Sequence, residues 1–110
     1  MAYKKNYKDL NFMQECVMRF IPSEPTGVHS KDIARNTGEN ERDIRYIIQT
    51  LRDNGIPICA TPKDGYWIAR TSRDLNETIN TLRNHITNCQ NTLKSLLDAK
   101  TEIERSENGN

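Results

Sequence analysis

The chain has 110 residues, which is enough for one compact domain and too few for two ordinary ones. Charged residues make up 28% and hydrophobic residues 35%, so we expect a small core with a solvated appendage. The formal net charge is +1, yet residues 1–73 carry 12 Lys and Arg against 9 Asp and Glu, and residues 74–110 carry 4 against 6. The first part is therefore the candidate for binding a polyanion, but this modest excess does not decide the matter.

Hydrophobic runs and cysteines exclude several classes of protein. No apolar run approaches the length of a membrane span, and the first ten residues lack the apolar core of a signal peptide. We therefore expect a cytoplasmic protein without a membrane partner. Three scattered cysteines and two isolated histidines predict neither a disulfide framework nor a metal site. No nucleophile with its base, and no phosphate loop, can be assembled, so we expect neither an enzyme nor a cofactor.

The first half of the chain predicts three helices. After a flexible basic arm over residues 1–9, apolar residues at helical spacing predict a first helix over Leu10–Phe20, ended by a proline. A very short strand is possible before the next helix, at Val28 and His29. Ser30 begins a second helix over Lys31–Asn36, and Asn40 caps a third over Glu41–Asp53. The lysines of the arm are Lys4, Lys5 and Lys8.

The second half predicts a hairpin and then one long helix. The strands are expected over Ile56–Ala60 and Tyr66–Ala69, joined by a turn that contains Pro, Asp and Gly. A helical pattern follows without Gly or Pro until Gly109. The fold class is thus mainly α with a small β-hairpin. We expect a DNA-binding domain over 10–71, a dimerisation helix over 72–105 and a disordered tail over 106–110.

The second and third helices fit a helix-turn-helix. Two helices that cross steeply through a short turn need a small residue at the crossing, a turn former and apolar residues on the inner face of the second helix. Those roles are filled by Ala34, Gly38, Ile44 and Ile47. Glu39 departs from the usual pattern, because many members of the family have an apolar residue there. On this motif alone, an αα-hairpin of an unrelated bundle remains an alternative.

The hairpin strengthens the assignment. Gly55-Ile56-Pro57-Ile58 and Gly65-Tyr66-Trp67-Ile68 resemble the wing of the winged helix-turn-helix domain at the start of the biotin repressor family. The resemblance covers about residues 10–70 and implies a winged-helix fold and DNA binding. Nothing in the chain resembles that family's biotin-handling domain. The chain also resembles small winged-helix proteins of phages and mobile elements.

The outer face of the third helix is the candidate recognition surface. With the isoleucines turned inward, 100° per residue places four polar side chains outward and a fifth near the edge. Arginine can pair with guanine and glutamine with adenine in a major groove, although the same residues also populate ordinary solvated faces. Phosphate contacts are expected from the start of the second helix and from the wing tip. The candidate DNA-binding residues are Ser30, Lys31, Arg42, Arg45, Tyr46, Gln49, Arg52 and Lys63.

The last helix carries a heptad repeat. Apolar residues alternate steps of four and three, with mostly β-branched residues at a and leucines at d, a pattern that favours a two-stranded coiled coil. From Leu75 to Ile103, at 1.5 Å per residue, the helix would extend roughly 43 Å, which is longer than the domain needs to cover its core. Parallel and antiparallel pairing both remain open, as does folding back over the domain's own surface. The predicted dimerisation residues are Leu75, Ile79, Leu82, Ile86, Cys89, Leu93 and Leu96.

Two functions fit these features. The first is sequence-specific binding of double-stranded DNA by a homodimer, as a transcriptional regulator or a replication-associated protein of a phage or plasmid. The second is a protein-interaction module, in which the winged helix binds a replication or defence protein rather than DNA. Genomic neighbourhood would separate these roles better than any feature of the sequence.

Overall fold

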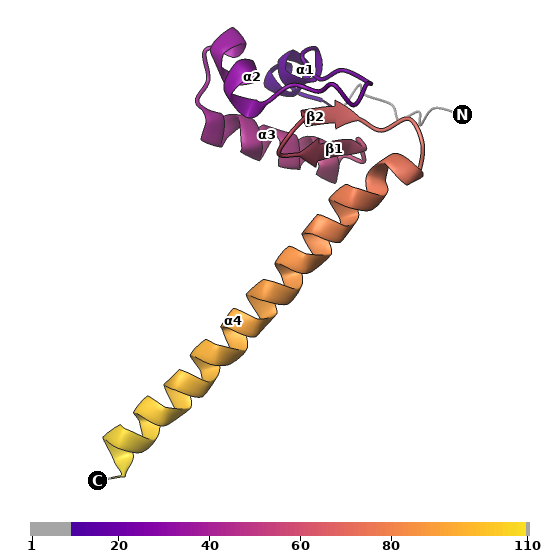
Figure 1. Cartoon of the computed structure of the whole chain (residues 1–110). Helices are drawn as coiled ribbons and strands as arrows, with labels where there is room; N and C mark the ends of the chain where they lie inside the picture. Colours follow the sequence, from indigo (N-terminus) through magenta and orange to yellow (C-terminus); the bar gives the residue numbers. More distant parts are fainter. Residues whose placement is uncertain (1–9, 110) are drawn as a thin grey trace. The chain divides into compact units, whose positions relative to one another are not determined.

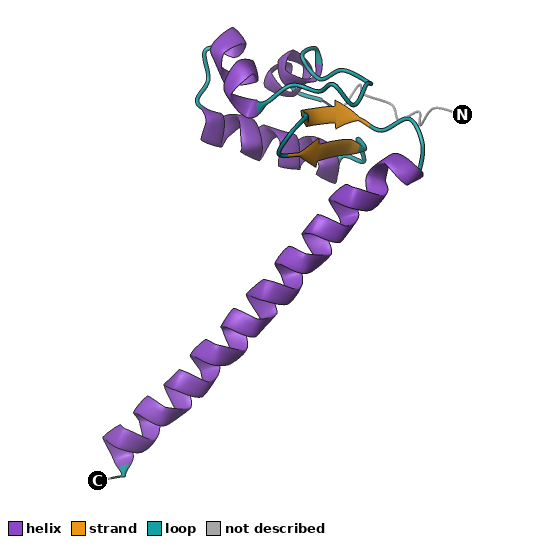
Figure 2. Cartoon of the chain, viewed as in Figure 1, coloured by secondary structure: helices purple, strands orange, loops and turns teal. Residues whose placement is uncertain are grey.

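A computed structural model describes residues 10–109 of the chain. It is mainly helical, with one two-stranded antiparallel hairpin and a long C-terminal helix, so the predicted fold class is confirmed (Figure 2). The basic arm predicted over residues 1–9 lies outside the described residues. The chain divides into two compact units, one ending at Thr78 and the other beginning at Ile79. In order, the elements are α1 (Phe12–Met18), α2 (Ser30–Thr37), α3 (Glu41–Asp53), β1 (Ile58–Thr61), β2 (Gly65–Ile68), a short 3-10 helix η2 (Arg73–Leu75) and α4 (Asn76–Asn108) (Figure 1).

Helix α1 is shorter than the predicted Leu10–Phe20. At its start the Asn11 side chain accepts a hydrogen bond from the amide of Gln14 (2.8 Å), and the Gln14 side chain accepts one from the amide of Asn11 (2.9 Å), which forms a capping box. At its end the amide of Ile21 bonds to the carbonyl of Met18 in a tighter turn. Proline disfavours helical geometry in the residue that precedes it, so the chain leaves the helix before Pro22.

The second and third helices lie close to their predicted positions. Helix α3 has the predicted bounds, and the side chain of Asn40 accepts the amide of Asp43 at 2.8 Å. Helix α2 ends as predicted at Gly38, whose φ of 77° is in the left-handed region that favours glycine. Its start differs, because His29 occupies the N-cap position and Ser30 is already the first helical residue.

The hairpin is joined by a third extended segment. Cys59 of β1 lies opposite Trp67 of β2, and the isolated bridge from Val28 to Tyr66 confirms the short strand predicted before α2. Two bonds form this bridge, of 2.9 Å from the Val28 amide and 2.7 Å from the Tyr66 amide. Strand β1 begins later than predicted, since the amide of Ile56 still bonds to the last turn of α3 and Pro57 has no amide hydrogen.

Two clusters of buried side chains hold the first unit together. The larger lies between the three helices and the hairpin and includes Val17, Ile33, Ile44, Ile48, Leu51, Ile56 and Ile58. Helix α1 is also tied to α3 by a hydrogen bond of 2.9 Å from the buried Gln14 side chain to the hydroxyl of Thr50. The smaller cluster contains Cys59, Trp67 and Ala69, with Leu75 packed against it.

Residues of η2 and of the first turn of α4 are bonded to β1. The hydroxyl of Thr78 is buried and accepts the amide of Ala60 at 3.1 Å, and the thiol of Cys59 donates to the carbonyl of Asp74 at 3.3 Å. Hydrogen bonds from the amides of Arg70 and Thr71 lower the pKa of the Asp74 carboxyl. These contacts explain why the first unit extends to Thr78, past the predicted boundary between 71 and 72.

Helix α4 continues past its predicted end at residue 105, through three residues of the predicted disordered tail. Arg105 forms an ion pair of 3.0 Å with Glu102, and the amide of Gly109 bonds to the Arg105 carbonyl at 2.7 Å. A cation in the last helical turn is favourable beside the partial negative charge of the carboxyl end. The helix therefore ends at Asn108, beside a glycine.

Two glycines with the same backbone angle give a test of the fold. Gly38 and Gly65 both have φ of 77°, but a Cβ at Gly38 meets nothing within 4 Å, whereas one at Gly65 would overlap the backbone carbonyl of Val28. Gly38→Ala should lower the free energy of unfolding by about 1–2 kcal/mol, the usual penalty of the left-handed region. Gly65→Ala should cost clearly more in urea unfolding, because it also breaks the bridge to Tyr66. Equal losses would contradict the role of that bridge.

Candidate nucleic-acid interface

The outer face of α3 is polar and exposed. Ile44, Ile48 and Leu51 are buried, as the helical period predicts. Turned away from them are Arg42, Arg45, Tyr46 and Gln49, all exposed. Tyr46 is 67% exposed. This face therefore presents hydrogen-bond donors, an amide and an aromatic ring together on one rigid helix.

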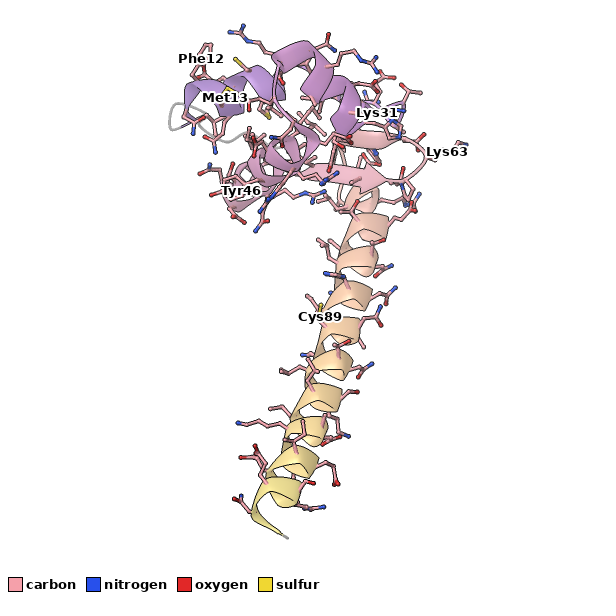
Figure 3. The ribbon with its side chains drawn as sticks, turned by 90° about the vertical axis from the view of Figure 1, so that its left-hand side faces the viewer. Phe12, Met13, Lys31, Tyr46, Lys63 and Cys89 are labelled. Carbon is pink, nitrogen blue, oxygen red and sulfur yellow. The ribbon has the colours of Figure 1, made fainter. Side chains whose placement is uncertain are left out.

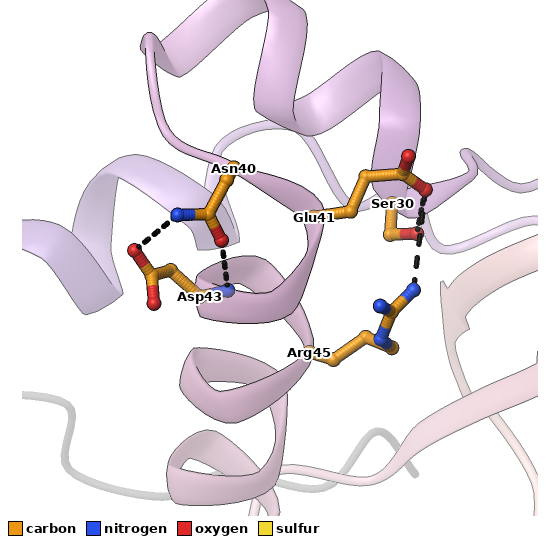
Figure 4. Close-up of polar contacts among 5 residues, drawn as sticks. All are labelled: Ser30, Asn40, Glu41, Asp43 and Arg45. Carbon is orange, nitrogen blue, oxygen red and sulfur yellow. Dashed lines mark hydrogen bonds and ion pairs between the residues drawn. The ribbon is translucent and has the colours of Figure 1, made fainter.

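A carboxylate lies at the N-terminal end of this face. Glu41 accepts a hydrogen bond from the hydroxyl of Ser30 (3.2 Å) and pairs with the guanidinium of Arg45 (3.9 Å), so that it bridges α2 and α3 (Figure 4). Sequence reasoning did not assign Glu41 to the site. The predicted phosphate contact from Ser30 therefore competes with a protein carboxylate. Both Glu41 and Arg45 are more than half exposed, so their ion pair is worth at most about 1 kcal/mol.

The two predicted phosphate-binding lysines lie at the same end of the domain. Lys31 is in the first turn of α2, and Lys63 is in the turn between β1 and β2. A ring nitrogen of His29 lies 3.1 Å from the carbonyl of Pro62, so the start of α2 and the hairpin turn are in contact. Both lysines are exposed, on the opposite side of the domain from Phe12 and Met13 (Figure 3). Asp32 and Asp64 directly follow these lysines in the sequence, so the edge that the lysines share also carries carboxylates.

Arg52 does not belong to the exposed face. Its Nε donates to the carbonyl of Ile58 at 3.0 Å, and its Nη2 is buried without a hydrogen-bond partner. Burial lowers the pKa of the guanidinium, partly offset by Tyr66 and Cys59 nearby. The structure thus places Arg52 between the last turn of α3 and β1. The helical period had put it at the edge of the face, but the period does not show that the hairpin folds over this edge.

The predicted dimerisation residues separate into two groups. Leu75 lies in η2 and packs against Cys59, Trp67 and Ala69 of its own domain, which makes it a core residue rather than part of the repeat. The large apolar side chains from Ile79 to Ile103 are 39% to 64% exposed. They include Leu97, which sequence reasoning did not assign. We call the following residues the α4 seam: Ile79, Leu82, Ile86, Cys89, Leu93 and Leu96.

One contact along the seam was also missed. His85 and Cys89 are four residues apart on α4, and the Nε2 atom of His85 lies 3.8 Å from the Sγ atom of Cys89. The sequence has no cysteine pair or histidine pair at ligand spacing, so each residue was expected to be isolated. A mixed histidine and cysteine pair at helical spacing was the available signal.

Comparisons with known proteins return no match: no family model, no curated protein and no solved structure is similar to this chain. Within residues 10–109, no helix is both long and apolar enough to cross a membrane.

Two arginines of α3 should differ in how much they contribute to stability, because Arg52 is packed against the hairpin and Arg42 is exposed. Arg52→Ala should lower the free energy of unfolding by about 1–3 kcal/mol, because it leaves the Ile58 carbonyl without its charged donor and removes packed side-chain atoms. Arg42→Ala, at an exposed position of the same helix, should change it by less than about 0.5 kcal/mol. Urea unfolding of both variants measures the difference. Similar small effects would return Arg52 to the exposed face.

Proposed function

We propose that the protein binds double-stranded DNA sequence-specifically, with α3 in the major groove, and that it is a binding protein rather than an enzyme. The observation that carries the proposal is the set of exposed side chains on α3 opposite the buried Ile44, Ile48 and Leu51: Arg42, Arg45, Tyr46 and Gln49. The short turn at Gly38 and the hairpin after α3 support it, because they give the element order of a winged helix-turn-helix. Such a role would place the protein in the cytoplasm, with the DNA.

The contacts divide into base reading and positioning. Arg45 and Gln49 are one helical turn apart and carry the two groups best suited to guanine and adenine edges. Lys31 and Lys63, at the edge that they share, would meet phosphates and fix the register of α3 in the groove. Glu41 would repel phosphates but could accept a hydrogen bond from cytosine. Arg45 can leave Glu41 at little cost, because their ion pair is exposed.

We further propose that two chains pair through the α4 seam. A helix of 33 residues with leucines and isoleucines more than a third exposed leaves apolar surface that water does not favour. Pairing of two such helices buries those side chains at the a and d positions of the heptad. A dimer would present two copies of α3, and therefore recognise two half-sites. Regulation of transcription and phage or plasmid replication are both compatible roles.

The first test separates base reading from phosphate contact. A binding site is obtained by selection from a random DNA pool, and each variant is titrated on it and on unrelated DNA. Arg45→Ala should weaken binding to the selected site by about 1–3 kcal/mol and relax the choice of base. Lys63→Ala should weaken binding to all sequences alike and reduce the slope of log K against log salt by about one. If no sequence is enriched, and both variants bind as weakly as the parent, α3 is not a recognition helix.

The second test concerns the seam. Leu82→Asp combined with Ile86→Asp places two charges on the apolar stripe, so sedimentation should show a folded monomer. The control is Asn84→Asp combined with Asn91→Asp, which adds the same charge at positions opposite the stripe and should remain a dimer. A seam variant that dimerises as tightly as the parent would rule out the coiled coil.

A second candidate function rests on a different surface. Phe12 on α1 is 75% exposed and Phe20, two residues past the end of α1, is 39% exposed, and they line a hollow of about 380 Å³ with Cys16 and residues at the end of α2. Exposed aromatic residues around a hollow are typical of protein-binding sites. If the domain binds a replication or defence protein instead of DNA, Phe12→Ser should abolish that interaction. Under the DNA proposal, Phe12→Ser leaves DNA affinity unchanged.

A further inference from the structure

His85 and Cys89 have the geometry of two ligands of one metal ion. With zinc bonds of about 2.3 Å to sulfur and 2.05 Å to nitrogen and a tetrahedral angle, the two ligand atoms are about 3.6 Å apart. The Nε2 atom of His85 and the Sγ atom of Cys89 are 3.8 Å apart, so a small side-chain rotation would complete the geometry. Both side chains are exposed and lie on a continuous helix, which fixes their spacing. The pair can therefore chelate a metal without rearrangement of the backbone.

The pair alone is half of a site. In residues 10–109 there is no group of three or more His, Cys, Asp or Glu side chains that could hold a metal. A structural zinc site needs four ligands. Cys89, however, occupies a d position of the heptad, and in a parallel two-stranded coil equal d positions face each other across the axis. A second copy would therefore bring the partner's Cys89 opposite Cys89, with the partner's His85 beside it.

We infer that two chains bind one zinc ion between them through His85 and Cys89 of each copy, and that this site fixes a parallel dimer. The inference rests on the proposed pairing through the α4 seam. Each thiol loses its proton to solvent as it binds, so two thiolates and two neutral imidazoles surround Zn²⁺ with no net charge. A neutral site suits an apolar seam, where an unpaired charge would be costly.

Zinc would then control dimerisation. Because the complete site exists only in the pair, zinc binding adds its free energy to that of dimerisation. At free zinc 100 times its dissociation constant, the dimer should be about 100-fold tighter than without metal. Without metal, the other seam residues would still pair, but more weakly. Since the proposed DNA site has two half-sites, zinc would also raise DNA affinity at low protein concentration.

The other thiols serve as controls. Cys59 is buried, and this burial, followed by the nearby charge of Asp74, raises the pKa of its thiol, which disfavours metal binding. Cys16 is half-buried on α1 and has no histidine among its hydrogen-bond contacts in the described chain. Cys16→Ser is therefore the matched control for Cys89→Ser.

The test uses the full chain, reduced and freed of metal, with Co²⁺ as a spectroscopic probe and Zn²⁺ in sedimentation. We expect one Co²⁺ per two chains, with the visible absorption of a tetrahedral thiolate site, and tightening of the dimer by Zn²⁺. Cys89→Ser should abolish the absorption and the tightening, His85→Ala should weaken both, and Cys16→Ser should change neither. Dimerisation of Cys89→Ser without metal should persist through the remaining seam.

Three outcomes would overturn the inference. Absorption unchanged in Cys89→Ser would place the metal elsewhere, and one metal per chain would show that no second copy completes the site. A dimer equally tight with Zn²⁺ and with chelator would show that the pair has no metal function, while leaving the seam intact. Failure of the seam itself looks different, because the parent then stays monomeric in chelator, like the variant with Leu82→Asp and Ile86→Asp.

Discussion

The structure depends on the apolar stripe of α3. Ile44, Ile48 and Leu51 have almost no exposed surface, and they contact side chains from α1, α2 and the hairpin. Because an α-helix has 3.6 residues per turn, burying these positions also determines which side chains point outward. The exposure of Arg45 and Gln49 is therefore a consequence of core packing. Loss of the stripe would remove the fold and the candidate recognition face together.

The hairpin completes that arrangement and also holds the first residues of α4. Its inner face closes the main core, and β2 is bridged to Val28 just before α2. Its other face packs Trp67 against Leu75, and the amide of Ala60 bonds to Thr78 at the start of α4. The same two short strands therefore hold the start of α2 and the start of α4. This explains how a domain with so few residues can order both the proposed DNA-binding face and the first turn of the helix proposed for dimerisation.

The helical periods allowed most of the fold to be predicted. The bounds of α3, its cap at Asn40 and the glycine after α2 follow from local sequence signals that the structure confirms. Contacts distant in sequence could not be predicted in this way. Arg52 was expected near the edge of the outer face, because its contact with the Ile58 carbonyl depends on how the hairpin folds back. Leu75 continued the heptad pattern, yet it lies in η2 and packs on its own domain.

The candidate site was predicted in part for the same reason. Periodicity predicted the exposed face of α3, but the carboxylate of Glu41 between Ser30 and Arg45 depends on the crossing of α2 and α3.

The most direct test of the proposed DNA binding is NMR chemical-shift mapping on a DNA duplex enriched by selection. The account predicts the largest changes over Arg42–Gln49, with smaller ones at Lys31 and Lys63. Changes centred on Phe12 and Phe20, or none at all, would contradict it.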